Sequence, residues 1–339
     1  MKTETEFERF FQTELLGDLH ELENKRLKIV GKVKIFLFFE FIIFIGLILF
    51  LFWLQPLRTG TKPEFDPFKI FWIFFILIIL GIIFIIAVTK FFAKFKIDFK
   101  EIVIRKIIGN ISKDIIYSPK DKIELNEFKS SGIFKTYNAD IAGYLGRDLI
   151  SSKIGDISYR FSWLTVSSKK YETSSYTSTK FHTTRSTKTV TSPLFNGIFF
   201  VADFGTSFQT NALIWPNMSK KLKLGGLVDF LQNKSLGNRI NLEDTVFEQE
   251  YAVYGEDIEA IKKIISPGLR QWIMDFRVKT GSQLYLSFTG PKMNLAVSLK
   301  KNFLEPPVFK KINDYNFIFE NYQYLLLFNG LLEDLSKKH

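Results

Sequence analysis

Two long apolar runs dominate the hydropathy pattern near the start of the chain, at residues 35–54 and 70–89. Each is about 20 residues long, the length that a helix needs to cross the ~30 Å hydrocarbon core of a bilayer. The pattern therefore predicts two membrane-spanning helices that are joined by a short external loop at residues 55–69. A cleaved signal peptide fits poorly, because the first run begins only after 34 mostly charged residues and lacks a small-residue cleavage pattern.

Residues 1–34 are predicted to form an amphipathic cytoplasmic helix. Apolar residues recur there at steps of three, four or seven, which places them on one face of a helix. These residues are Phe7, Phe11, Leu15, Leu19, Leu22, Ile29 and Val33. Arg26 interrupts the stripe, which favours a helix packed on the chain's own cytoplasmic domain over a self-standing coiled coil.

Residues 93–339 are predicted to form one cytoplasmic domain behind the hairpin, which with its flanks occupies residues 35–92. Clean alternation at 284–288 and 293–299, on either side of a Gly-Pro turn, predicts a β-hairpin. Residues 198–204 are apolar on both faces, as is typical of a central strand.

Helix signals complete the prediction for this domain. Ser266 and Pro267 are suited to begin a helix that ends before Gly281. Residues 91–108 and 314–335 are also expected to be helical, with Gly330 as a candidate break in the second. The expected fold class is α+β: a two-helix transmembrane hairpin preceded by an amphipathic helix and followed by a largely antiparallel sheet with flanking helices.

Residues 166–192 are unusual in composition, with 15 Ser or Thr among 27 residues and five basic residues against the single acid Glu172. Such segments are often linkers, but threonine also favours strands. We expect a hairpin projecting at the edge of the sheet, with a mobile loop as the alternative. Its surface is suited to contact anionic headgroups or a partner, or to remain solvated and prevent aggregation.

Basic residues flank the apolar runs unevenly. Eleven lie from Lys25 to Lys34 and from Lys90 to Lys106, whereas the connecting loop has three. Because basic residues near a span resist translocation, both termini are predicted to be cytoplasmic. The same clusters are expected to contact anionic headgroups, and they account for much of the net charge of +11. We therefore do not expect nucleic-acid binding.

Glu40 is the one ionisable residue inside an apolar run, and intramembrane acids are often functional. It lies five residues, about 7–8 Å, from the cytoplasmic end of its run. At that depth it can snorkel, be protonated, or meet Lys90 or Lys94 of the second run. The structural interpretation is favoured over an ion pathway, which would need several copies of the chain.

Three other carboxylates are weak candidates for a site, namely Asp203, Glu243 and Asp244. Asp203 interrupts an apolar strand, where a buried carboxylate must be paired or hydrogen-bonded. A bond to a turn amide or a neighbouring lysine is favoured over a role as a catalytic acid. Glu243 and Asp244 fit the first turn of a helix, where carboxylates satisfy free amides.

No catalytic, metal or cofactor motif stands out in the sequence. The histidines are His20, His182 and His339, and cysteine is absent, so neither a zinc cluster nor a Ser-His-acid triad has a convincing set of residues. Glycine-rich phosphate motifs are also absent. We therefore expect no cofactor, and we favour a non-enzymatic protein.

Residues 195–208, Phe-Asn-Gly-Ile-Phe-Phe-Val-Ala-Asp-Phe-Gly-Thr-Ser-Phe, resemble a bacterial membrane-protein family known as domain of unknown function 3137. The resemblance continues through residues 240–248, 251–254, 264–267, 284–288, 296–298 and 303–305. It implies a bacterial inner-membrane protein. It also implies that Gly197 admits the close approach of a neighbouring backbone. It brings no catalytic residue, and it implies a LemA-like membrane protein as a partner.

These observations predict a membrane-anchored interaction module that binds a protein partner or the inner surface of the membrane. Two alternatives stay open: a membrane-associated enzyme that uses carboxylates such as Asp203 and Glu243, and a subunit of an oligomeric pore or transporter. Homo-oligomerisation is compatible with all three.

Overall fold

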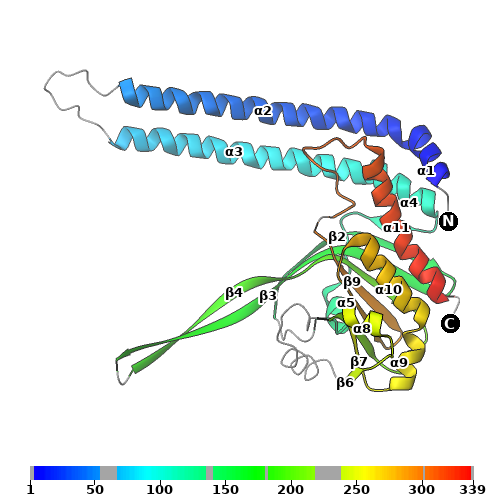
Figure 1. The fold of residues 1–339 in the computed structure, drawn as a ribbon. Helices are drawn as coiled ribbons and strands as arrows, with labels where there is room; N and C mark the ends of the chain where they lie inside the picture. The colour runs from blue at the N-terminus through cyan, green and yellow to red at the C-terminus, as the bar shows by residue number, and fades with distance from the viewer. Residues whose placement is uncertain are drawn as a thin grey trace. The chain divides into compact units, whose positions relative to one another are not determined.

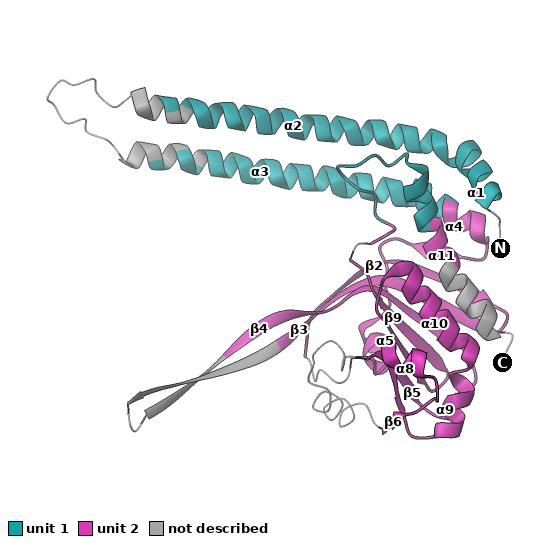
Figure 2. Ribbon diagram, in the orientation of Figure 1, with its two compact units in different colours: residues 1–106, 305–321 teal, residues 107–304, 322–339 magenta. Residues whose placement is uncertain are grey.

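The computed structural model describes residues 4–53, 67–134, 140–179, 182–217, 238–300 and 302–336. The chain divides into two compact units (Figure 2). Unit 1 comprises Met1–Lys106 and Glu305–Asn321, and unit 2 comprises Ile107–Leu304 and Tyr322–His339. Helices and one antiparallel sheet make up the structure, so the predicted α+β class is confirmed.

Unit 1 is helical (Figure 1). Its elements are α1 (Glu4–Phe10), the π-helical turn η1 (Phe11–Leu15), α2 (Leu16–Trp53), α3 (Pro67–Phe99) and the π-helical turn η2 (Lys100–Ile104). Helix α4 (Arg105–Ile111) continues the last of these. The predicted helices at residues 4–34 and 91–108 are therefore confirmed, although the second runs on to Ile111.

The predicted apolar stripe of the first helix is buried against a distant part of the chain. Phe7 and Phe11 are buried, and their ring centroids lie 6.1 Å and 5.2 Å from that of Tyr315. Phe319 packs on Phe7 at 5.4 Å. Residues 305–321 thus cover the stripe within unit 1, and the burial of these rings holds the segment in place.

Helices α2 and α3 run antiparallel and pack on each other. The rings of Phe36 and Phe84 stack with centroids 3.4 Å apart, and Lys32 lies 5.7 Å from the ring of Phe91. Within the described residues, one helical stretch, Leu77–Ile111, is long and apolar enough to cross a membrane. Residues 55–66 of the predicted external loop lie outside the described residues.

Unit 2 contains a nine-stranded antiparallel sheet within the described residues, in the order β1-β2-β3-β4-β9-β8-β5-β7-β6. The strands are β1 (Ile116–Ser118), β2 (Ile141–Ile154), β3 (Ile157–Thr179), β4 (His182–Asp203), β5 (Ala212–Pro216), β6 (Asn238–Ile240), β7 (Tyr251–Gly255), β8 (Leu284–Thr289) and β9 (Lys292–Ser298). The predicted hairpin is β8–β9, and the predicted central strand is the end of β4, which pairs with both β3 and β9.

Strands β3 and β4 extend beyond the rest of the sheet as a two-stranded ribbon (Figure 1). Strand β2 pairs with β3 only as far as Ser168, and β9 pairs with β4 only from Gly197 onward. The Ser/Thr-rich segment 166–192 lies in this hairpin. The hairpin extends from two central strands, because β2 and β9 flank its base. Its predicted position at the edge of the sheet is therefore wrong.

The core of unit 2 lies between α5 (Leu125–Ser130) and the central strands. Phe128 of α5 contacts Phe199 of β4 and Tyr144 of β2, with ring centroids 5.0 Å and 5.7 Å apart. Gly197 has a φ of +155°, and a Cβ there would clash with the carbonyl oxygen of Val297 on β9. The predicted role of this glycine, to admit close backbone approach, is therefore confirmed.

The remaining helices of unit 2 are α8 (Thr245–Glu250), α9 (Ile258–Ile264) and α10 (Pro267–Thr280), while α11 (Tyr315–Ser336) belongs in part to each unit. Ser266 caps α10 by accepting a hydrogen bond from the Leu269 N–H, and Gly281 ends it with a φ of +63°, as predicted. Helix α11 is continuous through Gly330, so the suggested break there is wrong.

Candidate functional site

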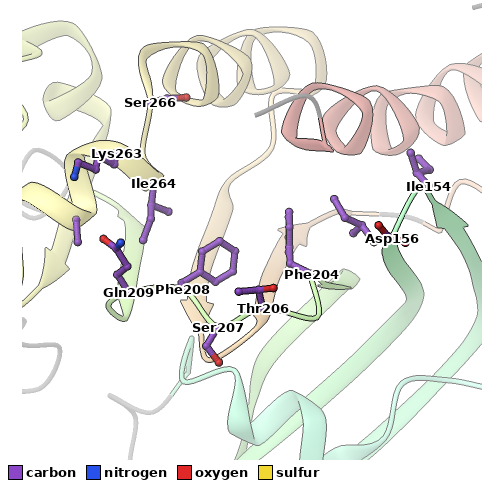
Figure 3. Close-up of a pocket in the computed structure, with 13 residues that line it drawn as sticks. Ile154, Asp156, Phe204, Thr206, Ser207, Phe208, Gln209, Lys263, Ile264 and Ser266 are labelled. Carbon is purple, nitrogen blue, oxygen red and sulfur yellow. The ribbon is translucent and has the colours of Figure 1, made fainter. Parts of the chain in front are cut away.

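A cavity of about 810 Å³ opens in unit 2 where three segments meet (Figure 3). The segments are the turn between β2 and β3 at residues 154–157, the loop after β4 at residues 204–209, and α9 with the following Ser266. The volume lies within the usual range for small-molecule sites, roughly 300–1,000 Å³. The loop after β4 belongs to the stretch on which the family resemblance was first seen.

Hydrogen bonds at both ends hold the loop after β4 in place. The carboxylate of Asp203 accepts a hydrogen bond from the Gly205 N–H at 3.0 Å, and Gly205 has a φ of +71°. The N–H groups of Phe204 and Phe208 donate to the carbonyls of Pro291 and Gly290, each at 2.9 Å. The loop is thus fixed against the β8–β9 turn, and Asp203 serves as the turn acceptor that the sequence favours.

The cavity has a mixed polar and apolar lining. Phe204, Phe208 and Ile264 supply apolar surface (Figure 3). The polar groups are the Lys263 ammonium, the Thr206 and Ser207 hydroxyls, the Gln209 amide and the Asp156 carboxylate. The described lining includes neither histidine nor cysteine, so it holds no nucleophile beside an imidazole base. The lining thus offers charged and hydrogen-bonding groups beside apolar surface.

Glu243 and Asp244 lie at the start of α8, as the sequence predicts. Asp244 caps the helix by accepting a hydrogen bond from the Phe247 N–H at 3.1 Å, and it pairs with Arg270. Glu243 is exposed and pairs with Lys262 at 3.0 Å. Neither carboxylate is among the described residues that line the cavity. Both therefore act in local structure, and the structure does not bring them to Asp203.

Glu40 faces α3 within unit 1. Its Oε1 lies 3.3 Å from the point where a Cβ on Gly81 would stand. Gly81 is nine residues, about 13 Å along the helix, from Lys90. The described contact of Glu40 is therefore with a glycine in the middle of α3, and the predicted arrangements of its carboxylate stay predictions.

Two buried carboxylates of unit 2 were missed in the sequence. Asp148, 1% exposed, accepts hydrogen bonds from the Tyr117 hydroxyl at 2.7 Å and the Asn302 amide at 2.9 Å. Its φ of +63° is a left-handed conformation that non-glycine residues adopt at a cost. The one local signal for it is the charged pair Arg147-Asp148 in an otherwise apolar part of β2.

Glu127 of α5 is the second of these carboxylates. One of its oxygens accepts hydrogen bonds from Arg160 at 2.7 Å and from Lys292 at 2.8 Å. Burial raises the pKa of Glu127, but the two hydrogen bonds outweigh this effect and leave the pKa below its ordinary value. Among the described residues, no group of three or more histidine, cysteine or acidic side chains is placed to hold a metal ion.

Fold and cavity together define an α+β domain that presents an open, mixed polar surface. Residues 193–337 match the model of a family described as a protein of unknown function, DUF3137. The resemblance seen in the sequence is therefore confirmed over these residues, which include the cavity loop, the β8–β9 hairpin and α9 to α11. No curated protein and no solved structure matches the chain.

Proposed function

We propose that the protein is a membrane-anchored binding module in which both α2 and α3 cross the bilayer. The observation that carries this proposal is the outward apolar surface of both helices. Among the described side chains, ten large apolar ones between Ile35 and Leu49 of α2 and ten between Phe71 and Ile86 of α3 are 37% to 63% exposed. Burying such a side chain completely, instead of leaving it in water, is favourable by about 1.5–3 kcal/mol. Lipid around the helices would provide this burial. Two adjacent helices with this surface support a hairpin of two spans.

In the proposed topology both termini lie in the cytoplasm and the membrane is the bacterial inner membrane. The support is the charge bias, with eleven basic residues beside the cytoplasmic ends of the spans and three in the connecting loop. Fused after His339, green fluorescent protein is expected to fluoresce and alkaline phosphatase to be inactive. The reverse pattern would overturn the orientation.

Unit 2 supplies the binding surface in this proposal, through the β3–β4 ribbon. From Lys170 along β3, and along β4 as far as Phe195, the outer edge of each strand is unpaired with any other described strand. An exposed strand edge presents N–H and C=O groups to which a partner can add a strand. We infer a protein partner that binds the ribbon in this way.

The composition of the ribbon indicates the charge of that partner. Residues 166–192 carry five basic residues and one acid, which favours encounter with an acidic segment. A LemA-like membrane protein, which the family resemblance suggests, is one partner to look for. The anionic membrane surface is the competing occupant, and the experiment separates the two.

A photo-crosslinking residue at Ser174 of the ribbon tests this proposal in native membranes, with the same residue at the exposed Val278 of α10 as the matched control. Crosslinks to a discrete protein from position 174, absent from position 278, are the expected result. Replacing residues 170–190 with Asn-Gly keeps Lys169 next to Thr191, which are paired in the sheet, and should abolish copurification of that protein. Crosslinks to lipid alone would overturn the protein-binding proposal.

A further inference from the structure

The loop at residues 305–314 of unit 1 is fixed to α3 at its beginning. The carboxylate of Glu305 accepts a hydrogen bond from Lys96 at 3.1 Å and lies 3.8 Å from the ammonium of Lys100. Lys100 is buried, and Glu305 lies within ion-pair distance of it. The start of the loop is therefore held at a defined height along α3.

Two backbone contacts fix the rest of the loop to α2. Arg26 donates a hydrogen bond from Nη1 to the carbonyl of Val308 at 2.9 Å, and the Ile312 N–H donates to Glu23 at 3.2 Å. The loop is thus held on both sides of residues 309–311, a segment called the apex below.

The apex presents an aromatic ring and two lysines. Phe309 is 75% exposed, and its ring packs edge-on against Phe92 of α3 with centroids 6.0 Å apart. Lys310 and Lys311 are exposed. An aromatic ring beside exposed lysines is typical of a surface that lies at a membrane interface.

The height of the apex along α3 agrees with such an interface. Phe92 lies three residues, about 4.5 Å, beyond Thr89, where the proposed span ends. Lys96 lies seven residues, about 10 Å, beyond it. The headgroup layer is roughly 5–7 Å thick on each side of the hydrocarbon core. The apex therefore lies at the depth of the headgroups, while the attachment at Glu305 lies on the cytoplasmic side of them.

We propose that residues 309–311 are a third membrane contact of unit 1, in which Phe309 inserts into the interfacial layer and Lys310 and Lys311 bind anionic lipid headgroups. This inference rests on the proposed crossing of the membrane by α2 and α3. Two observations favour lipid over a protein occupant. The apex is continuous with the apolar surface of α3, and its lysines add to the cation of Lys32, which lies beside Phe91 at the same end of the span.

Single cysteines in the full-length chain, which has none of its own, test the proposal. The variants Phe309→Cys, Phe38→Cys and His20→Cys carry an environment-sensitive fluorophore in vesicles of phosphatidylcholine and phosphatidylglycerol. Position 38 lies inside the proposed span, and position 20 is exposed about 22 Å outside it along the helix. Lipids that carry a quencher near the headgroup are then added, and the loss of fluorescence at each label is measured. Lys310→Cys with the same label serves as a second apex variant.

Quenching at positions 38 and 309 but not at position 20 is the expected result. In vesicles of phosphatidylcholine alone, or with Lys310→Gln and Lys311→Gln beside the label at 309, quenching at 309 should fall while quenching at 38 stays unchanged. Quenching at 38 without quenching at 309 and 310 would overturn the loop proposal and leave the anchoring intact. Absence of quenching at 38 would overturn the membrane proposal, and the loop proposal with it.

Discussion

Glu23 and Arg26, one turn apart on α2, form a bidentate ion pair with N–O distances of 2.9 Å and 2.7 Å. Their side chains are 9% and 6% exposed, respectively. The hydrogen bond from Arg26 lowers the pKa of Glu23 and outweighs the opposing effect of burial. Because Arg26 also binds the Val308 carbonyl and Glu23 the Ile312 N–H, this pair is the attachment point of the loop at residues 305–314.

Removing one member of the Glu23–Arg26 pair should release this loop. Glu23→Gln leaves the buried Arg26 cation unpaired, and Arg26→Met leaves the buried Glu23 carboxylate unpaired, which costs about 3–5 kcal/mol in either case. Trypsin cleavage after Lys310 and Lys311 should then accelerate by on the order of 100-fold or more, because proteolysis follows the population of the open form. The rate is measured on the purified full-length chain.

The exposed pair Glu21–Lys25 on the same helix provides the control for this prediction. Its members are 2.8 Å apart and largely solvated, so Glu21→Gln should leave the cleavage rate unchanged. Equal acceleration by Glu21→Gln and Glu23→Gln would show that the buried pair has no special role in holding the loop.

Asp148 combines a strained backbone with two buried hydrogen bonds, and substitutions separate these contributions. Asp148→Gly removes the acceptor but relieves the positive φ, whereas Asp148→Ala removes the acceptor and keeps the strain. We expect both to lower the free energy of unfolding, with alanine worse than glycine by about 1–2 kcal/mol. Urea unfolding of the full-length chain in detergent, followed by tryptophan fluorescence, measures the difference.

Tyr117→Phe isolates one hydrogen bond of the same network. It should lower the free energy of unfolding by about 1.5–3 kcal/mol, since the acceptor is charged and buried.

The comparison of the two Asp148 variants tests the strain at this position. If Asp148→Ala lowers the free energy of unfolding no more than Asp148→Gly does, the left-handed backbone stores no strain.

Features with short-range causes could be predicted from the sequence. Asp244 and Ser266 each cap a helix through an amide three residues ahead, so the signal lies within one turn of the chain. The β8–β9 hairpin is similarly local. The role of Gly197 was expected from the family resemblance of the stretch that contains it.

Long-range partners could not be predicted. Arg26 appeared in the sequence as an interruption of an apolar stripe, and the Val308 carbonyl that it binds is 282 residues away. Asp148 meets Asn302 across 154 residues. Such pairs depend on the fold of the whole chain, since no local pattern indicates which distant donor a carboxylate meets. For the same reason the hairpin of β3 and β4 was expected at an edge of the sheet.

Glu127 should make the stability of unit 2 depend on pH in the acid range. Its folded pKa lies below the ordinary value of 4.5, so its contribution is fully present above about pH 4.5 and is lost as the pH falls through the folded pKa. At pH 7, Glu127→Gln should lower the free energy of unfolding by about 1.5–3 kcal/mol. The difference from the wild type should shrink below pH 4.5. Urea unfolding at several pH values measures both.

Glu256, an exposed acid between β7 and α9, is the matched control for Glu127. Glu256→Gln should leave the free energy of unfolding within about 0.5 kcal/mol of the wild type at every pH. A gap between Glu127→Gln and the wild type that stays constant down to pH 3 would contradict a carboxylate held ionised by Arg160 and Lys292.

The contact between Glu40 and Gly81 predicts how substitutions affect the packing of α2 on α3. Gly81→Leu should push the two helices apart, because the added side chain needs the space that Glu40 occupies. Gly81→Ala should be tolerated, since its Cβ meets only the end of a flexible side chain. Bis-maleimide crosslinking between Phe36→Cys and Phe84→Cys, whose native rings stack, reports the helix contact. Crosslinking should fall with Gly81→Leu and recover with Glu40→Ala added, and failure of that recovery would show that the two residues do not share this space.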